Sequence, residues 1–256
     1  MILDRFRLDG RVAIVTGAGR GIGRGCALAF AEVGARVVCA ARTLGQLEET
    51  AQEVCRRGGE ALCVPCDVME TSQLAELVER ARRELGRIDV LVNNAGGSPP
   101  SPALQTSEKA FETALRFNLT SAFLLSQLAI PVMQQGGGGS IVNVSSAAGR
   151  LVQAKFVAYG TAKAALSFMT RQLAAEFAPA VRVNALAVGA VKTSALMPFL
   201  SAELEKAMAD LTPMARLGEV EDIALAALYL ASPASSWVTG KVFEVDGGTE
   251  KTNWPF

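Results

Sequence analysis

The sequence predicts an α/β fold in which a parallel sheet is covered by helices on both faces. Short apolar runs, each about as long as a β-strand, alternate along the chain with segments of helical pattern. The strands are continuously apolar, as burial on both faces requires, and do not alternate between apolar and polar residues. Strand–helix–strand units close through right-handed crossovers, which makes the sheet parallel.

The individual elements follow from this alternation in order. In the first half, strands are expected over residues 11–16, 35–41, 61–65 and 88–92, with helices ending near 33 and 57 and a third over 72–85. In the second half, residues 107–135 are expected to form two helices in series, followed by a strand over 140–145, a helix over 156–177, a strand over 181–187, helices from about 202 and over 220–231, and a final strand over 241–245. No linker rich in Pro, Gly or Ser and no internal repeat divides the chain, so residues 1–256 are predicted to be one domain.

Composition excludes several classes of partner. Half of the 256 residues are hydrophobic, and 25 Lys and Arg residues balance 25 Asp and Glu residues. No basic tract suggests a nucleic-acid partner, and no apolar run approaches the roughly 20 residues that span a bilayer. The first ten residues are too charged for a signal peptide. We therefore expect a cytoplasmic protein that acts on a small-molecule substrate, with no nucleic acid or membrane as partner.

Histidine is absent from the chain, which excludes a Ser-His-Asp hydrolase, a His-paired cysteine enzyme and a His-ligated metal site. Tyrosine, lysine and carboxylates remain as acid/base groups. The only tyrosines are Tyr159 and Tyr229, and the second lies in the apolar helical run over 225–230. Tyr159 is therefore the leading candidate for proton transfer.

The five cysteines fall within the first 66 residues, and Cys63 and Cys66 have the spacing of a redox or metal motif. They lie at a predicted buried strand, however, and no second ligand pair follows. We expect them to be small buried hydrophobic residues, and we expect no metal site.

Tyr159 and Lys163 lie one helical turn apart, on the same face of the predicted helix. An ammonium group beside a phenol favours phenolate, so the pair predicts a lowered Tyr159 pKa and proton exchange with an alcohol oxygen. Ser146, at the end of the strand before this helix, could face the same point. The alternative is an ordinary exposed Tyr/Lys pair on a helix, and this short spacing alone does not distinguish the two.

A glycine cluster follows the first predicted strand, at Gly17, Gly21 and Gly23. Strand, glycine cluster and helix together aim backbone N–H groups at a phosphate, and this position in a βαβ pattern favours a dinucleotide site. No acidic residue, which would bind a ribose 2′-hydroxyl, occurs between Val33 and Leu47. Arg20 and Arg42 could instead bind a 2′-phosphate, so we predict NADP(H) over NAD(H), the alternative being two solvated arginines.

Taken together and in order, the motifs identify the chain as resembling the short-chain dehydrogenase/reductase family from about residue 10 to residue 248. The motifs are the segment from Thr16 to Gly23, Asp67–Val68, the segment from Asn93 to Gly96, Asn118, Ser146, Tyr159 with Lys163, and the segment from Asp246 to Gly248. The resemblance implies a Rossmann-type domain with a seven-stranded sheet, NAD(P)-dependent hydride transfer, and a homo-oligomer, either tetramer or dimer. Helices 107–135 and 156–177 would pair between subunits.

The same resemblance assigns roles to residues. Ser146 is selected over Ser145 because the family serine precedes the tyrosine by about thirteen positions, and Asn118 would hold a water beside Lys163. The implied catalytic residues are Asn118, Ser146, Tyr159 and Lys163; the implied cofactor-binding residues are Gly17, Arg20, Gly21, Ile22, Gly23, Arg42, Asp67, Val68, Asn94, Ala95, Gly96, Tyr159, Lys163, Val191 and Thr193. Asp67 and Val68 would contact adenine, Asn94 the ribose region and Thr193 the nicotinamide amide, while the stretch from Asn93 to Gly96 would line the cofactor. Val188 stands where the family usually has proline, which predicts a less rigid loop after the sixth strand.

Residues 194–213 are expected to form a substrate lid. If Leu196, Met197, Phe199 and Leu200 face the site, they favour a bulky apolar substrate, whereas plain core packing is an equal alternative. The segments 94–97, 212–218 and 232–238 resemble bacterial hydroxysteroid dehydrogenases, so a hydroxysteroid is one expected substrate.

Two other functions remain open at this point. A 3-oxoacyl-carrier-protein reductase would need a basic cluster near the site, and helix 156–177 offers only Lys163 and Arg171. A non-catalytic cofactor-sensing protein would not need Ser146, Tyr159 and Lys163. The tail from Lys251 to Phe256, with two large aromatic residues, would close a pocket or an interface, or fray.

Overall fold

A computed structural model describes residues 1–254, apart from the side chain of Phe199. All seven strands belong to one parallel sheet, in the order β3-β2-β1-β4-β5-β6-β7, which confirms the predicted fold class. The strands are β1 (Val12–Thr16), β2 (Arg36–Ala41), β3 (Glu60–Pro65), β4 (Val90–Asn93), β5 (Gly139–Ser146), β6 (Val181–Val188) and β7 (Val242–Val245). Every residue of β1 is buried, as expected for a strand covered on both faces.

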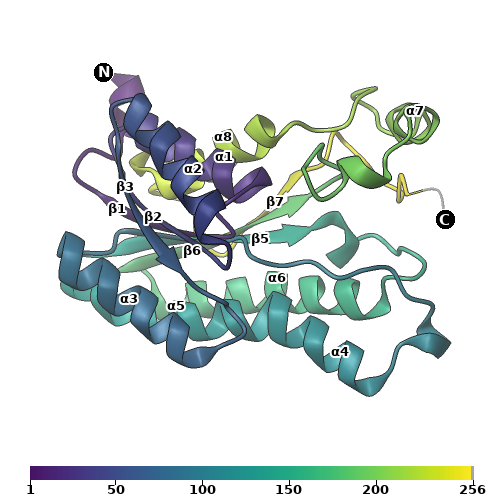
Figure 1. The fold of residues 1–256 in the computed structure, drawn as a ribbon, viewed down its shortest axis with the longest axis horizontal. Helices are drawn as coiled ribbons and strands as arrows, with labels where there is room; N and C mark the ends of the chain where they lie inside the picture. The colour runs from purple at the N-terminus through teal and green to yellow at the C-terminus, as the bar shows by residue number, and fades with distance from the viewer. Residues whose placement is uncertain (255–256) are drawn as a thin grey trace.

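Helices cover both faces of the sheet (Figure 1). On one face, Phe30 and Leu47 belong to the core that α1, α2 and α8 form with the strands; on the other, Leu74 and Leu125 belong to the core formed with α3, α5 and α6. The helices are α1 (Gly21–Glu32), α2 (Leu44–Arg56), α3 (Thr71–Leu85), α4 (Glu108–Leu115), α5 (Ser121–Gln135), α6 (Val157–Phe177), α7 (Ala202–Asp210) and α8 (Val220–Ala231).

The strand order reverses direction between β1 and β4, which are neighbours in the sheet. β1 pairs with β2 on one side and with β4 on the other, so Thr16 at its end lies beside both Ala40 and the end of β4. The chain leaves β1 toward α1 on one face and leaves β4 toward α4 and α5 on the other (Figure 1). Open α/β sheets bind ligands in the crevice at such a switch point.

The predicted helical pair over 107–135 is joined without a loop. Ser107 caps α4, accepting a hydrogen bond from Ala110 N, and a π-helical turn, Arg116–Thr120, leads directly into α5. A π turn inserts one residue into the helical repeat, which explains why the sequence pattern breaks there, and such turns occur often at functional sites. Asn118 lies in this turn and is buried.

Two segments rise above the carboxyl ends of the strands. One contains the short 3₁₀ turn Met197–Phe199 and then α7, which begins where the sequence predicted a helix. The other follows β7 and runs beside α7 toward the C-terminus (Figure 1). Over residues 1–254, none of the helices combines the length and apolar character that crossing a membrane would require.

Candidate active site

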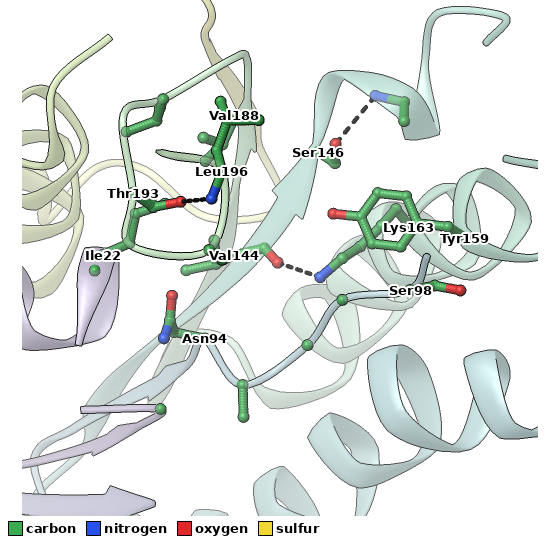
Figure 2. A pocket seen from close by; sticks show the side chains of 18 of the residues that line it. Ile22, Asn94, Ser98, Val144, Ser146, Tyr159, Lys163, Val188, Thr193 and Leu196 are labelled. Carbon is green, nitrogen blue, oxygen red and sulfur yellow. Dashed lines mark hydrogen bonds between the residues drawn. The ribbon is translucent and has the colours of Figure 1, made fainter. Parts of the chain in front are cut away.

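A cavity of about 1320 Å³ lies at the carboxyl ends of the strands (Figure 2). It exceeds the roughly 300–1,000 Å³ of a pocket for one drug-sized molecule, so it has room for a cofactor and a substrate. Of the residues expected to bind the cofactor or to act in catalysis, Gly23, Asn93 and Asn118 do not line it; those that do are Gly17, Arg20, Gly21, Ile22, Arg42, Asp67, Val68, Asn94, Ala95, Gly96, Ser146, Tyr159, Lys163, Val191 and Thr193.

Thr16 joins the two strands that meet at the switch point, a role that no separate sequence pattern predicted. Its buried hydroxyl donates to Val92 O at 3.2 Å and accepts from the backbone N–H groups of Asn94 and Ala95, both at 3.0 Å. One side chain therefore fixes where the chain after β4 lies relative to the glycine loop.

The glycine loop is tightly packed beneath the cavity. Gly17 has a φ of +67°, in the left-handed region that favours glycine. Gly23 lies so close to Gly17 that a Cβ atom there would be 2.3 Å from Gly17 O. Gly23 thus acts by letting the first turn of α1 approach the strand, which turns the N–H groups at the start of this helix toward the cavity.

Positive charge gathers where β2 ends. Arg20 and Arg42 line the cavity, and neither guanidinium forms an ion pair with a residue in the described part of the chain. Asp67, the only acidic residue on the described lining, accepts a hydrogen bond from Met69 N at 3.0 Å. The glycines, the helix N-terminus and the two arginines fit the phosphates of a dinucleotide.

The segment after β4 differs from the expectation at one residue. Asn94 lines the cavity while its side chain donates to Thr16 O at 2.8 Å, so it also braces the glycine loop. The expectation that Asn93 lines the cofactor is wrong. Its side chain points into the protein and donates to Asn143 Oδ1 at 2.9 Å and Ser126 Oγ at 3.1 Å, because successive strand residues face opposite sides of the sheet.

The two serines at the end of β5 have different surroundings. Ser145 is buried, and its hydroxyl donates to Lys163 O at 2.9 Å, which anchors α6 to the strand. Ser146 lies at the cavity, where its hydroxyl accepts a hydrogen bond from Ala148 N at 3.2 Å and interacts with Tyr159 (Figure 2). The geometry therefore places Ser146, and not Ser145, beside the phenol.

Tyr159 and Lys163 lie on one face of α6, as the spacing predicted, and the Lys163 Nζ atom is 5.7 Å from the centre of the phenol ring. The expected lowering of the Tyr159 pKa by Lys163 is wrong for the protein's own groups. Burial raises the pKa of Tyr159, and the hydrogen bond with Ser146 opposes that rise only in part. The phenol therefore keeps its proton at neutral pH.

The Lys163 ammonium is directed toward the strand. It donates to Val144 O at 2.8 Å, as Figure 2 shows, and burial lowers its pKa to about 8. Its Nζ atom and Asn118 both approach Gly96, where a Cβ atom would be 2.7 Å from Asn118 Oδ1 and 3.1 Å from Nζ. A glycine is thus needed at residue 96 for the two side chains to lie where they do.

Asn118 holds the segment after β4 from behind. Its Oδ1 accepts from Gly97 N at 2.7 Å, and its Nδ2 donates to Gly97 O at 3.0 Å and Ala114 O at 2.9 Å. The π turn presents this amide toward Gly97. The structure thus gives Asn118 a bracing contact that the sequence did not indicate, beside its expected role with Lys163.

Val188 is held within a strand and not in a loop. It is the last residue of β6, is buried, and is paired with Ser146 on one side and Val245 on the other. Thr193, further along, directly precedes segment 194–213, which was predicted to be a lid: its hydroxyl accepts from Leu196 N at 3.3 Å (Figure 2). Thr193 also lies 3.6 Å from where a Cβ atom on Gly21 would be, so segment 194–213 starts opposite the glycine loop.

Among the apolar residues of segment 194–213, some line the cavity and one is packed in the core. Leu196 and Leu204 line the cavity, Met208 is fully buried, and Met197 and Leu211 are exposed. Of the residues for which facing the site and core packing were both open, Met197 and Leu200 do not line the cavity, and the side chain of Phe199 lies outside the described residues. Spacing alone could not decide which face of the short helical segments turns toward the cavity.

The tail adds lining residues that the sequence left ambiguous. Thr252, Asn253 and Trp254 line the cavity, and the indole of Trp254 contacts the ring of Phe156 edge-on, with 6.0 Å between centres. Pro255 and Phe256 lie outside the described residues. Phe156 lies three residues before Tyr159, and its ring contacts the Tyr159 ring. It was also not singled out from the sequence.

The Cys63–Cys66 pair has no ligand cluster around it. Cys66 is buried, lines the cavity, and has a pKa raised to about 11 by burial, while Cys63 is half-buried beside Cys39 in the neighbouring strand. Within residues 1–254, no group of three or more His, Cys, Asp or Glu side chains is arranged to hold a metal ion.

Comparison with known proteins places this geometry in a family. The model of the family described as Enoyl-(Acyl carrier protein) reductase matches residues 17–250. An uncharacterised oxidoreductase of Mycobacterium tuberculosis is 48% identical over 250 residues, which are 97% of this chain and 95% of that protein. The 7alpha-hydroxysteroid dehydrogenase of Escherichia coli is 41% identical over 246 residues, covering 96% of each chain.

A solved structure of 7 alpha-hydroxysteroid dehydrogenase, complexed with NADH and 7-oxo glycochenodeoxycholic acid, superposes with a TM-score of 0.93. It is 40% identical and covers 96% of each chain, so the similarity extends over nearly the whole chain. Fold, cavity and relatives agree: the chain belongs to the short-chain dehydrogenase/reductase family, as an NAD(P)-dependent oxidoreductase that acts on CH–OH groups.

Proposed function

We propose that this protein uses NADP(H) to interconvert a secondary alcohol and a ketone on a bulky apolar substrate, with hydroxysteroids as the substrate class. The observation that carries the proposal is the meeting of Ser146 and Tyr159 at one wall of a cavity that is apolar on the substrate side. In this proposal residues 1–256 act as one catalytic domain with a lid over 194–213. The homo-oligomeric state and cytoplasmic location stay predictions.

Tyr159 is the proposed proton donor and acceptor. Because burial raises its pKa, the phenol is protonated at neutral pH and can give its proton to a ketone oxygen during reduction. The Ser146 hydroxyl donates a hydrogen bond to the same oxygen as negative charge develops there. When bound, the nicotinamide supplies or accepts the hydride.

Lys163 and Asn118 form the proposed proton path behind the phenol. The lowered Lys163 pKa, about 8, lies close to neutrality, so the ammonium can exchange its proton without a large energy difference. Asn118 approaches the same point at Gly96. In the oxidation direction this path would carry the proton away from Tyr159.

The preference for NADP(H) is supported by Arg20 and Arg42. Two guanidinium groups without an ion-pair partner in the described part of the chain suit a 2′-phosphate, and the nearby lining contains no carboxylate before Asp67. The related 7 alpha-hydroxysteroid dehydrogenase structure contains NADH, so a direct comparison of the two cofactors is required.

The apolar lining supports a bulky substrate. Leu151, Leu196, Leu204, Phe156 and Trp254 all line the cavity. Two cations outside this lining are paired with carboxylates: Arg150 with Glu244, Asp246 and Glu250, and Lys192 with Glu205 and Glu219. On the described lining itself, Arg20 and Arg42 are assigned to the cofactor and Lys163 to the proton path, which leaves Lys155. This pattern favours an apolar substrate over docking of an acidic carrier protein.

A substrate panel tests the proposal. Purified protein is incubated with NADPH or NADH and with ketosteroids, sugars or 3-oxoacyl thioesters, while the loss of absorbance of the reduced cofactor is followed. We expect turnover of ketosteroids with NADPH, and loss of nearly all turnover in Tyr159→Phe with NADPH binding retained. Turnover confined to thioesters would favour the carrier-protein reductase, and no turnover of any ketone would favour the cofactor sensor.

A further inference from the structure

The segment after β7 forms part of the cavity wall on the Tyr159 side. We propose that Trp254 is a specificity-determining residue, whose indole forms the face against which the fused-ring body of a substrate packs. This inference rests on the proposed alcohol–ketone function and deepens it, because it defines the shape of the substrate: a rigid ring system longer than a single ring.

Three aromatic rings connect the tail to the reacting phenol. The indole of Trp254 meets the ring of Phe156 at 6.0 Å and 89°, and Phe156 meets Tyr159 at 6.0 Å and 64°. Edge-to-face contacts of this kind fix the orientation of each ring. All three residues line the same cavity, so the indole is held at a defined distance from the Tyr159 hydroxyl.

The tail is attached to both walls of the cavity. On the lid side, Asn253 Nδ2 donates to Thr212 Oγ1 at 3.0 Å, and Met214 N donates to Gly247 O at 3.1 Å. On the other side, Arg150, four residues after Ser146, donates to Thr249 O at 2.8 Å and pairs with Asp246. Figure 1 shows the segment running beside α7. Trp254 is therefore carried by a braced segment.

The position of the indole selects for substrate length. A ketone whose oxygen lies at the Tyr159 hydroxyl must extend past the Phe156 ring before it reaches Trp254. A fused-ring ketone does so, and buries one face of the indole, whereas a single six-membered ring stays beside Phe156. Tryptophan presents one of the largest apolar faces among the side chains, with few rotatable bonds to restrict on binding.

The test compares two substrates in two alanine variants. Trp254→Ala removes the proposed wall, and Trp237→Ala is the matched control, because Trp237 is 99% exposed and lies outside the cavity lining. Kinetics are measured with NADPH, a 7-ketosteroid and cyclohexanone. We expect the ratio of kcat/KM for the steroid to kcat/KM for cyclohexanone to fall at least tenfold in Trp254→Ala, mainly through the steroid KM, with partial recovery in Trp254→Phe and no change in Trp237→Ala.

A binding measurement makes the test independent of turnover. The chain has two tryptophans, so Trp237→Phe leaves Trp254 as the only one, and its fluorescence is recorded while the steroid is added without cofactor. We expect saturable quenching that cyclohexanone does not produce. Equal kinetic losses on both ketones in Trp254→Ala, or an unchanged ratio together with unchanged fluorescence, would overturn the role of Trp254.

The two proposals fail in different ways. If the wild-type enzyme reduces cyclohexanone but no fused-ring ketone, the assignment of Trp254 is overturned while the oxidoreductase function stands. If neither ketone is reduced with NADPH, the proposed function is overturned, and the fluorescence titration alone then decides whether a fused-ring ligand meets Trp254.

Discussion

Replacing Lys163 by methionine should make the protein more stable and at the same time inactive. The lysine side chain is only 4% exposed, and burial of its charge lowers its pKa from 10.5 to about 8. At about 1.4 kcal/mol for each pH unit, that lowering corresponds to about 3 kcal/mol of destabilisation at neutral pH. Methionine has a similar length and carries no charge, so this cost is absent from the variant.

The lost hydrogen bond offsets part of the gain. Lys163 Nζ donates to Val144 O at 2.8 Å, and such a bond contributes about 1 kcal/mol. The net increase in the free energy of unfolding is then about 2 kcal/mol at pH 7. For a chain of this size that corresponds to a rise in Tm of about 4–8 °C.

The pH dependence identifies the cause. The folded-state pKa lies below the unfolded value, so the cost of the buried charge is fully present below pH 8. It disappears as the pH rises from 8 toward 10.5, because the unfolded chain binds more protons in that range. Thermal unfolding at pH 7, 8.5 and 10 should therefore show the advantage of Lys163→Met shrinking toward zero. Lys109→Met, at an exposed residue of α4, serves as the control. An advantage independent of pH, or a less stable variant, would refute the reasoning.

Three further outcomes are expected. Arg42→Asp should weaken NADP⁺ binding by about 10- to 100-fold, because a charged hydrogen bond to the 2′-phosphate is lost and repulsion is added, and it should strengthen NAD⁺ binding. A binding titration with both cofactors checks this prediction. Equal effects on the two affinities would contradict it. Ser146→Ala should lower kcat by about 10²- to 10³-fold. Ser145→Ala should chiefly lower Tm, because the Ser145 hydroxyl donates a hydrogen bond to Lys163 O that attaches α6 to β5. Steady-state kinetics and thermal unfolding of both variants separate the two roles. Thr16→Val leaves the backbone N–H groups of Asn94 and Ala95 without their acceptor, so it should reduce the free energy of unfolding by about 2–4 kcal/mol and weaken cofactor binding. Thr16→Ser should restore both. Retention of the wild-type Tm in Thr16→Val would contradict this prediction and show that water replaces the hydroxyl.

Features that depend on local pattern were predictable from the sequence. The succession of strands and helices along the chain, the start of α7, and the shared face of Tyr159 and Lys163 follow from short-range periodicity, and the structure confirms each of them. The direction of the Tyr159 pKa was not predictable, because it depends on how deeply the ring is buried and on where the Lys163 ammonium points.

Features that depend on distant contacts were not predictable. The inward side chain of Asn93 is set by its partner on β5, and the joining role of Thr16 by β4. Segment 194–213 has apolar residues at helical spacing, but only Leu196 among Leu196, Met197 and Leu200 reaches the cavity. Trp254 becomes part of the wall because Thr212 and Arg150, far apart in the sequence, both hold the tail.

The meeting of β1 and β4 at the switch point also sets the order in which the cofactor pocket can form during folding. Thr16 and Val92, whose contact joins the glycine loop to the segment after β4, are separated by 76 residues. Closing so long a loop is slow compared with forming the intervening helices, because its entropy is lost before the contacts are gained. During refolding, far-UV circular dichroism should therefore recover early, and the fluorescence enhancement of bound NADPH should appear in a later, slower phase.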